Sequence, residues 1–306
     1  MFADLRLILV VIALVTGVCV VTVAVRFALP LLAGPSEQLR LWLERRGPRF
    51  GRYAETVRRD WAYLIVMALV ILLGAFVFFS IAEDVAEGDP SLAADRATYL
   101  FMRSLRTPLG DTILTAVTEL GDSIMVTTMG VLVAAWLIWR RAWRPLVFWA
   151  LAVAGGSILN TAIKLALHRT RPTDLYHASW DAFSFPSGHS TTNAVLYGFL
   201  AVLIARELPR RLRLPLACAT SSFVALIAFS RLYLGAHWLS DVMGGLAFGS
   251  AWVAVLAFLQ AHGRSHPVGG RPLLAICLAT LILAGGVHIA RQHAADLRLY
   301  ALRAAS

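Results

Sequence analysis

Two polar residues, His237 and Asp241, stand four positions apart near the start of an apolar stretch. On a helix this spacing places both side chains on one face. A carboxylate that accepts a hydrogen bond from one imidazole nitrogen fixes the tautomer and makes the other nitrogen more nucleophilic. One interpretation is therefore a catalytic nucleophile with its orienting carboxylate, and the other is a buried structural histidine–aspartate pair.

Two cations, Lys164 and Arg171, are separated by seven positions, and Pro172 follows directly. Seven residues make nearly two helical turns, so we expect both cations on one helix face, about 10 Å apart along the axis. Pro172 suits the end of that helix. Together the two side chains suit a phosphate, because arginine can grip it with two hydrogen bonds and lysine adds a compact charge. Two cations that merely extend to the membrane surface are the alternative. Neither His168 nor Arg169, which lie between them, is given a role.

A short polar segment, residues 185–190 (Phe-Pro-Ser-Gly-His-Ser), precedes another apolar run. Ser187 is expected to cap the helix that begins there. The unpaired amides of a helix start form an anion site, and Gly188 allows an anion to come close. His189 would then lie beside the bound anion. A capping serine with a purely structural histidine is the alternative.

Ser230 and Arg231 add a third cation six residues before His237. All of these groups fall at the ends of four successive apolar stretches that share one face. Together they offer three cations, two histidines, one carboxylate and a helix start, which favours a phosphate site. A metal site fits less well, because three cations would repel a metal ion. We expect no metal and no cofactor.

The elements that carry these residues are predicted to be membrane helices. Of the 306 residues, 58% are hydrophobic and 15% are charged, against about 25% charged in an ordinary soluble domain. This composition excludes a soluble globular protein and a disordered one. A span needs about 20 apolar residues. The stretches that qualify are 7–33, 61–82, 123–139, 145–167, 188–205, 214–230, 238–260 and 273–290. We therefore predict an all-α integral membrane protein with about eight transmembrane helices.

Details of three stretches bear on that prediction. The first is read as a retained helix, because its apolar run exceeds the roughly 7–15 residues of a signal peptide. Gly245 and Gly249 are expected to allow close helix packing in the seventh span. The long connection 83–122 carries apolar residues at helical spacing, which predicts short amphipathic helices at the membrane surface. These helices either act as a lid or simply pack on the bundle. Aromatic residues that could line a headgroup entrance, or only anchor the chain at the interface, are Trp180, Phe183 and Phe185.

The net charge of +10 could indicate nucleic acid, acidic lipid or membrane topology. Sixteen arginines lie in four segments that alternate onto one face: 34–60, 140–144, 206–213 and 261–272. The connection 83–122 on the other face has eight acids and three arginines. The positive-inside rule places the arginine-rich loops in the cytoplasm and the polar site outside. Topology thus accounts for most of the charge, and no nucleic-acid partner is expected. The three scattered cysteines form neither a disulfide framework nor a metal cluster.

The polar residues resemble the three-part signature of the type 2 phosphatidic acid phosphatase (PAP2) superfamily. Its pattern is Lys-x6-Arg-Pro, then Pro-Ser-Gly-His, then Ser-Arg-x5-His-x3-Asp. The eleven matching positions are Lys164, Arg171, Pro172, Pro186, Ser187, Gly188, His189, Ser230, Arg231, His237 and Asp241. The resemblance implies a six-helix catalytic core over residues 61–260. A helix and a basic cytoplasmic loop (1–60) would precede this core, and a helix and a tail (261–306) would follow it.

The resemblance also implies metal-independent hydrolysis of a lipid phosphate. By this analogy His237 attacks phosphorus and forms a phosphohistidine, Asp241 holds His237, and His189 protonates the leaving alkoxide. The residues that would hold the phosphoryl oxygens are Lys164, Arg171, Ser187, Gly188 and Arg231. Candidate substrates are phosphatidic acid, lysophosphatidic acid, phosphatidylglycerophosphate and polyprenyl diphosphate, entering from the outer leaflet of the inner (plasma) membrane.

Three other functions share part of this pattern. Vanadium-dependent haloperoxidases bind vanadate with similar residues, but they look soluble, and the predicted spans argue against them. A lipid-linked phosphotransferase would use the same residues with an alcohol in place of water. A transporter or scaffold that only binds phosphate would not need both histidines. The headgroup, the acceptor and the oligomeric state stay open.

Overall fold

The computed structural model describes residues 2–31, 42, 45, 48–88, 93–172, 183–261 and 267–305, and this part of the chain contains helices and no strand. In chain order the helices are α1 (Phe2–Leu31), α3 (Pro48–Glu87), α4 (Ala93–Ser104), α5 (Pro108–Glu119), α6 (Ser123–Trp139), α7 (Trp143–Ala150), a π-helical turn (Leu151–Gly155), α8 (Gly156–Leu167), α9 (Gly188–Ala205), α10 (Arg210–Tyr233), α11 (Leu239–Ala261) and α12 (Gly270–Ala305). The predicted all-α membrane fold is confirmed.

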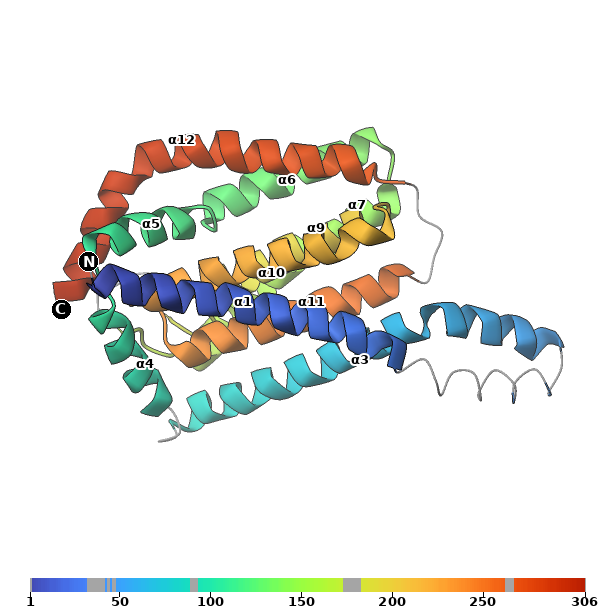
Figure 1. Cartoon of the computed structure of the whole chain (residues 1–306), viewed down its shortest axis with the longest axis horizontal. Helices are drawn as coiled ribbons and strands as arrows, with labels where there is room; N and C mark the ends of the chain where they lie inside the picture. The colour runs from blue at the N-terminus through green and yellow to red at the C-terminus, as the bar shows by residue number, and fades with distance from the viewer. Residues whose placement is uncertain are drawn as a thin grey trace.

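The long helices run side by side as a bundle, with α4 lying across one end (Figure 1). Helix α11 packs on α3 and α9, α10 packs on α1 and α9, and α12 packs on α5, α6 and α9. Both chain termini lie at the end of the bundle that α4 covers (Figure 1). Seven helical segments within the described residues are long and apolar enough to cross a membrane. They include all the predicted spans except 188–205.

The exception, α9, is the central helix, and its two halves differ. Its C-terminal half is apolar, and Leu196, Phe199 and Leu203 are fully buried in the main hydrophobic core. Its N-terminal half is buried but polar. The Asn193 side-chain amide donates to the carbonyl of Gly121 at 2.9 Å. Because buried polar groups need partners, this half of α9 is confined to the one place where the neighbouring helices supply them.

The connection 83–122 contains two helices, as predicted, but only α4 lies across the bundle end. Helix α5 instead runs in line with α6 (Figure 1) and packs against α10 and α12. The expectation of a surface helix is wrong for α5 because its polar residues Thr115, Thr118 and Glu119 are fully buried rather than solvated. These side chains face neighbouring helices, so the spacing of apolar residues alone did not identify the buried face.

The basic stretch predicted as a loop is in part helical. Helix α3 begins at Pro48 and continues to Glu87, so residues 48–60 belong to a helix and not to a loop. Proline is well suited to the first position of a helix, because the N–H that it lacks would have no partner there. Residues 34–41, the first part of the predicted loop, lie outside the described residues.

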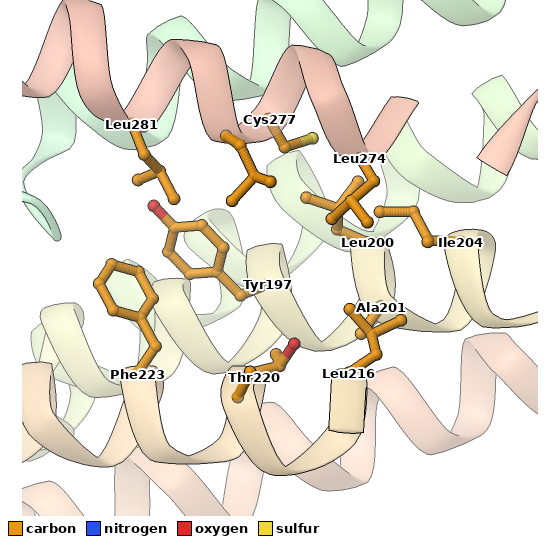
Figure 2. Close-up of a pocket in the computed structure, with 12 residues that line it drawn as sticks. Tyr197, Leu200, Ala201, Ile204, Leu216, Thr220, Phe223, Leu274, Cys277 and Leu281 are labelled. Carbon is orange, nitrogen blue, oxygen red and sulfur yellow. The ribbon is translucent and has the colours of Figure 1, made fainter. Parts of the chain in front are cut away.

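An apolar cavity of about 270 Å³ lies between α9, α10 and α12. Figure 2 shows the side chains that surround it, among them Tyr197, Phe223 and Leu281. None of the twelve lining residues is a lysine, arginine, aspartate or glutamate. The cavity is therefore unsuited to a phosphate group, and the polar chemistry of this chain lies elsewhere.

The glycine pair of α11 makes the predicted close approach to α9. A Cβ added to Gly249 would lie 2.9 Å from both the Cβ of Ala194 and the carbonyl oxygen of Thr191. A Cβ added to Gly245 would lie 2.9 Å from the carbonyl oxygen of Ser187. These glycines let the two backbones touch at the level where α9 begins.

We predict that Gly249→Ala lowers stability by about 1–3 kcal/mol, the usual cost of overpacking. The thermal unfolding midpoint of the purified protein in detergent is the measurement. Gly286→Ala is the control, because a Cβ there meets nothing within 4 Å. Equal midpoints for the two variants would contradict close packing of α9 on α11.

Candidate active site

The predicted site residues come from five neighbouring parts of the chain. They lie at the end of α8, in the segment after it, at the start of α9, at the end of α10 and at the start of α11. In that order the residues are Lys164, Arg171, Ser187, Gly188, His189, Arg231, His237 and Asp241. The start of α11 lies at the bundle end that α4 covers, because Ser240 donates to Asp95 of α4.

His237 and Asp241 are in contact, but not on one helix face. Helix α11 begins at Leu239, so His237 precedes it. Nδ1 of His237 lies 3.4 Å from Oδ2 of Asp241, and the backbone N–H of Trp238 donates to the same oxygen at 2.9 Å. A carboxylate at the third helical position commonly reaches back to the N–H before the helix. The expected pairing on one helix face is therefore replaced by this helix-start arrangement.

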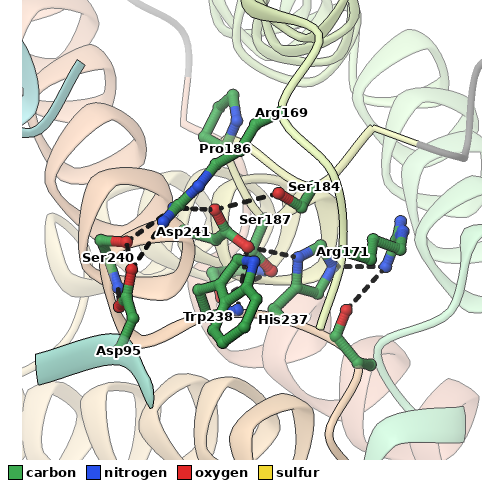
Figure 3. Close-up of polar contacts among 12 residues, drawn as sticks. Asp95, Arg169, Arg171, Ser184, Pro186, Ser187, His237, Trp238, Ser240 and Asp241 are labelled. Atoms are coloured by element: carbon green, nitrogen blue, oxygen red, sulfur yellow. Dashed lines mark hydrogen bonds and ion pairs between the residues drawn. The ribbon is translucent and has the colours of Figure 1, made fainter. Parts of the chain in front are cut away.

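The other oxygen of Asp241 is held by Arg169. Nη1 of Arg169 donates to Oδ1 at 2.6 Å, and the hydroxyl of Ser184 donates to it at 3.3 Å (Figure 3). Asp241 is fully buried. A buried carboxylate is costly unless it is paired and hydrogen-bonded, so Arg169 and Ser184 keep this one charged and fixed.

Arg169 is fixed in turn by Asp95 of α4. Its Nη2 donates to Oδ2 of Asp95 at 2.6 Å (Figure 3). Ser240 adds two bonds to the same carboxylate, from its backbone N–H at 2.8 Å and from its hydroxyl at 2.6 Å. The helix across the bundle end is thereby tied to the residue that holds His237.

The second nitrogen of His237 faces a cation. Nε2 lies 3.1 Å from Nη1 of Arg171, which also donates to the carbonyl of Ala236 at 2.9 Å (Figure 3). Burial, followed by the charges of Arg171, Arg231 and Lys164, holds the pKa of His237 well below its usual range. The imidazole is therefore neutral at neutral pH, and a lone pair is available on the ring.

Lys164 and Arg171 do not share a helix face. Helix α8 ends at Leu167, and His168 adopts the left-handed conformation, with φ of 48°. The chain turns there, so Arg171 lies beyond the helix rather than two turns along it. The expected spacing was wrong because Pro172 does not mark the helix end, which comes five residues earlier. Both cations nevertheless act on the charge of His237.

The start of α9 has the predicted cap. Ser187 is the N-cap, and its hydroxyl accepts from the N–H of Ser190 at 3.4 Å. The backbone N–H of Ser187 donates to the carbonyl of Asp241 at 3.0 Å. A Cβ added to Gly188 would lie 3.8 Å from Nζ of Lys164. The lysine ammonium group and the helix start thus lie together, as an anion site requires.

His189 and Arg231 contact residues from the other side of the bundle. Nε2 of His189 lies 2.7 Å from Oδ1 of Asp122. Nη1 of Arg231 donates to the hydroxyls of Thr118 and Tyr300, each at 2.8 Å. The structure therefore brings the predicted residues together and adds partners from α5, α6 and α12.

Three of these partners were not singled out in the sequence: Asp95, Arg169 and Asp122. Neither was His288, whose Nε2 lies 3.2 Å from Oδ2 of Asp122. A signal existed for His288, because an ionisable residue inside an apolar run is costly and tends to be functional. Arg169 stood between two candidate cations, but its contact with Asp241 spans 72 positions. Asp95 and Asp122 were counted only among the acidic residues of the connection 83–122, because no neighbouring residue in the sequence indicates their partners.

The aromatic residues proposed for a headgroup entrance are placed differently. Phe185 is fully buried, and its ring stacks on that of Phe78 at 5.8 Å, so that expectation is wrong for Phe185. The Phe183 ring meets the His168 imidazole edge-on at 4.5 Å. Trp180 lies outside the described residues.

Fold and site together define a helical membrane protein with a cluster of cations and histidines among its helices. The PAP2 superfamily profile matches residues 145–265. Phosphatidylglycerophosphatase B of Bacillus subtilis is 30% identical over 179 residues, which cover 57% of this chain and 87% of that protein. Lipid A 1-phosphatase of Rhizobium johnstonii is 31% identical over 146 residues, which cover 44% of this chain and 54% of that protein.

A solved structure agrees with these matches. The crystal structure of a transmembrane PAP2-type phosphatidylglycerolphosphate phosphatase from Bacillus subtilis superposes with a TM-score of 0.57 at 27% sequence identity. It covers 64% of this chain and 98% of the solved one. The chain belongs to the PAP2 superfamily and is a membrane lipid phosphatase of that family.

We predict that Arg169→Gln lowers the kcat for a lipid phosphate while changing KM little. The variant removes a charged hydrogen bond from Asp241, and such a bond contributes about 1.5–3 kcal/mol, or about 10- to 100-fold in rate. Steady-state release of phosphate is the measurement. Arg96→Gln, an exposed arginine on α4, is the matched control. An unchanged kcat for Arg169→Gln would show that Asp241 does not depend on this contact.

Proposed function

We propose that this enzyme hydrolyses a lipid phosphate ester without a metal, through a phosphohistidine formed on His237. The observation that carries the proposal is the setting of the His237 imidazole. Asp241 holds its Nδ1, and cations surround the other side of the ring. A neutral, oriented imidazole beside an anion site is an activated nucleophile.

In the first step Nε2 of His237 attacks phosphorus, and the bond to the leaving alkoxide breaks. His189 donates a proton to the departing oxygen, and Asp241 stabilises the charge that develops on His237. The phosphoryl oxygens are held by Lys164, Arg171, Arg231, Ser187 and the Gly188 amide. Phosphoryl transfer depends mainly on such positioning and charge stabilisation.

In the second step water replaces the alcohol. His189, now neutral, takes a proton from the water, whose oxygen attacks the phosphorus of the phosphohistidine. The bond from phosphorus to Nε2 breaks, and inorganic phosphate leaves. A lipid-linked phosphotransferase would follow the same steps with an alcohol as acceptor, and this is our second candidate.

Membrane-spanning helices support a lipid as the substrate, because they leave the phosphate site at one end of an apolar bundle. The alkyl chains can then stay in the bilayer while the phosphate enters the cationic pocket. The relatives are named for phosphatidylglycerophosphate and for lipid A. Phosphatidylglycerophosphate, phosphatidic acid, lysophosphatidic acid and polyprenyl diphosphate are the candidates for this chain.

We further propose that the site faces outward, to the periplasm in a Gram-negative cell. Arginines gather at the bundle end away from α4, in the connections between α6 and α7 and between α9 and α10. Such loops face the cytoplasm. The enzyme would then lie in the inner (plasma) membrane and take its substrate from the outer leaflet.

We predict that His237→Ala abolishes phosphate release from phosphatidic acid and from polyprenyl diphosphate, because no other group can form the covalent intermediate. Purified protein in detergent with EDTA is assayed for inorganic phosphate. Asp241→Asn should lower kcat more than it raises KM, since Asp241 acts on His237 rather than on the substrate.

The exposed α3 residue Glu83 provides the matched control as Glu83→Gln, which should keep wild-type activity. Wild-type turnover by His237→Ala would contradict the nucleophile, and activity lost in EDTA would contradict the metal-free mechanism. Transfer of labelled phosphate to an added alcohol, in place of phosphate release, would favour the phosphotransferase.

The orientation is tested by single cysteines in a background without Cys19, Cys218 and Cys277. Glu87→Cys, at the exposed end of α3 beside α4, should react with an impermeant thiol reagent in whole cells. Arg211→Cys, exposed at the opposite end, should react only after lysis. The reverse pattern would invert the proposed topology.

A further inference from the structure

Asp122 occupies the N-cap position of α6 but does not cap the helix. Its backbone has the extended geometry of an N-cap, with φ of −66° and ψ of 161°, yet its side chain makes no capping hydrogen bond. Aspartate is favoured at this position because it accepts from the first free amides of the helix. Here the carboxylate turns elsewhere, so another interaction determines its position.

The carboxylate lies between two imidazoles. Oδ1 is 2.7 Å from Nε2 of His189, and Oδ2 is 3.2 Å from Nε2 of His288. His288 is buried on α12, a helix that lies outside residues 145–265 matched to the family. Both oxygens of Asp122 are therefore committed to histidines that come from different helices.

Two further contacts join α12 to the same wall of the site. Nδ1 of His293 lies 3.2 Å from each carboxylate oxygen of Glu119, which is fully buried. The hydroxyl of Tyr300 accepts from Arg231 at 2.8 Å. Three residues of α12 thus contact Asp122, Glu119 and Arg231.

The contact with Asp122 determines which atom of His189 can serve the reaction. A carboxylate accepts hydrogen bonds but does not donate them, so Nε2 of His189 carries a hydrogen that it donates to Asp122. The proton that can move is then the one on Nδ1. This is the mirror of the first pair, in which Asp241 holds Nδ1 of His237 and the reacting atom is Nε2.

The charge of Asp122 has a second effect. Burial, followed by the charge of Arg231, lowers the pKa of His189 to about 4, and the hydrogen bond and charge of Asp122 oppose that shift. A general acid must carry its proton until the leaving oxygen needs it. Without this carboxylate the cations that hold the phosphate would also drive the proton from His189.

We propose that Asp122 is a positioning residue for His189, that it favours the proton on Nδ1 that the leaving alkoxide takes, and that His288 of α12 holds Asp122 in place. This inference rests on the function proposed above. As the bond from phosphorus to oxygen breaks, its electron pair stays on the alkoxide oxygen, which takes the Nδ1 proton. His189 is left neutral, and its Nε2–H still donates a hydrogen bond to Asp122.

The test uses the basicity of the leaving group. An alkyl phosphate such as dodecyl phosphate releases a strongly basic alkoxide that needs the proton, whereas 4-nitrophenyl phosphate releases a weakly basic phenolate that does not. The kcat/KM ratio is compared for the two esters, because it reports the steps up to cleavage. Asp122→Asn keeps the size and the N-cap preference of aspartate, but it removes the charge and leaves one acceptor oxygen in place of two.

We expect Asp122→Asn to lower kcat/KM for dodecyl phosphate by about 100-fold and for 4-nitrophenyl phosphate by less than about threefold. His288→Ala should show the same selectivity with a smaller loss. That variant keeps the Asp122 carboxylate and removes only the imidazole that holds it, so it provides the comparison if Asp122→Asn does not fold. Glu83→Gln is the matched carboxylate control and should affect neither ester.

An equal loss for both esters, or no loss for either, would overturn the inference and leave the proposed function intact. If the wild-type protein hydrolyses neither ester nor any lipid phosphate, the proposed function itself is contradicted. The two failures are therefore distinguishable in one set of assays.

Discussion

The paired carboxylate of Asp241 is the interaction on which the rest of the site depends. It is fully buried, and a charge in that position must be neutralised and hydrogen-bonded or it is lost. His237, the Trp238 amide, Arg169 and Ser184 supply those partners. They come from the start of α11, from the segment after α8 and from the approach to α9, so satisfying one carboxylate brings three parts of the chain together. Asp95 extends the network to α4 through Arg169, which is why a helix lying across the bundle end belongs to the site.

The same requirement explains how a membrane bundle tolerates a cluster of cations. Lys164 and Arg231 are almost fully buried, and buried positive charges repel one another unless they are held apart. Hydrogen bonds point two of the cations at fixed acceptors: Arg231 donates to Thr118 and Tyr300, and Arg171 donates to the Ala236 carbonyl. Fixed cations need not reorganise when charge develops on a phosphoryl group, and this is the main source of electrostatic catalysis.

Whether a feature could be predicted from the sequence depends on how far apart along the chain the interacting residues lie. The spans 123–139 and 188–205 coincide with α6 and α9, because apolar runs end where polar residues, Gly or Pro begin. The cap at Ser187 was predictable for the same local reason. The helix end at Leu167 was not, since the left-handed turn at His168 stands four residues before the proline that suggested it. Arg169 and Asp122 escaped prediction because their partners, Asp241 and His189, lie more than 60 positions away.

In the proposed mechanism, two histidine–carboxylate pairs with opposite geometry act on the two sides of a phosphate. Asp241 holds Nδ1 of one ring and Asp122 holds Nε2 of the other, so the reacting atoms differ while the electrostatic principle is the same. The first pair lies within the part of the chain that matches the family, whereas the second depends on α6 and is braced by α12, which the match does not include. Nucleophilic attack and protonation of the leaving group are separate demands. A relative could therefore keep the first pair while building the second from another helix, and the leaving group it accepts would then change with that helix.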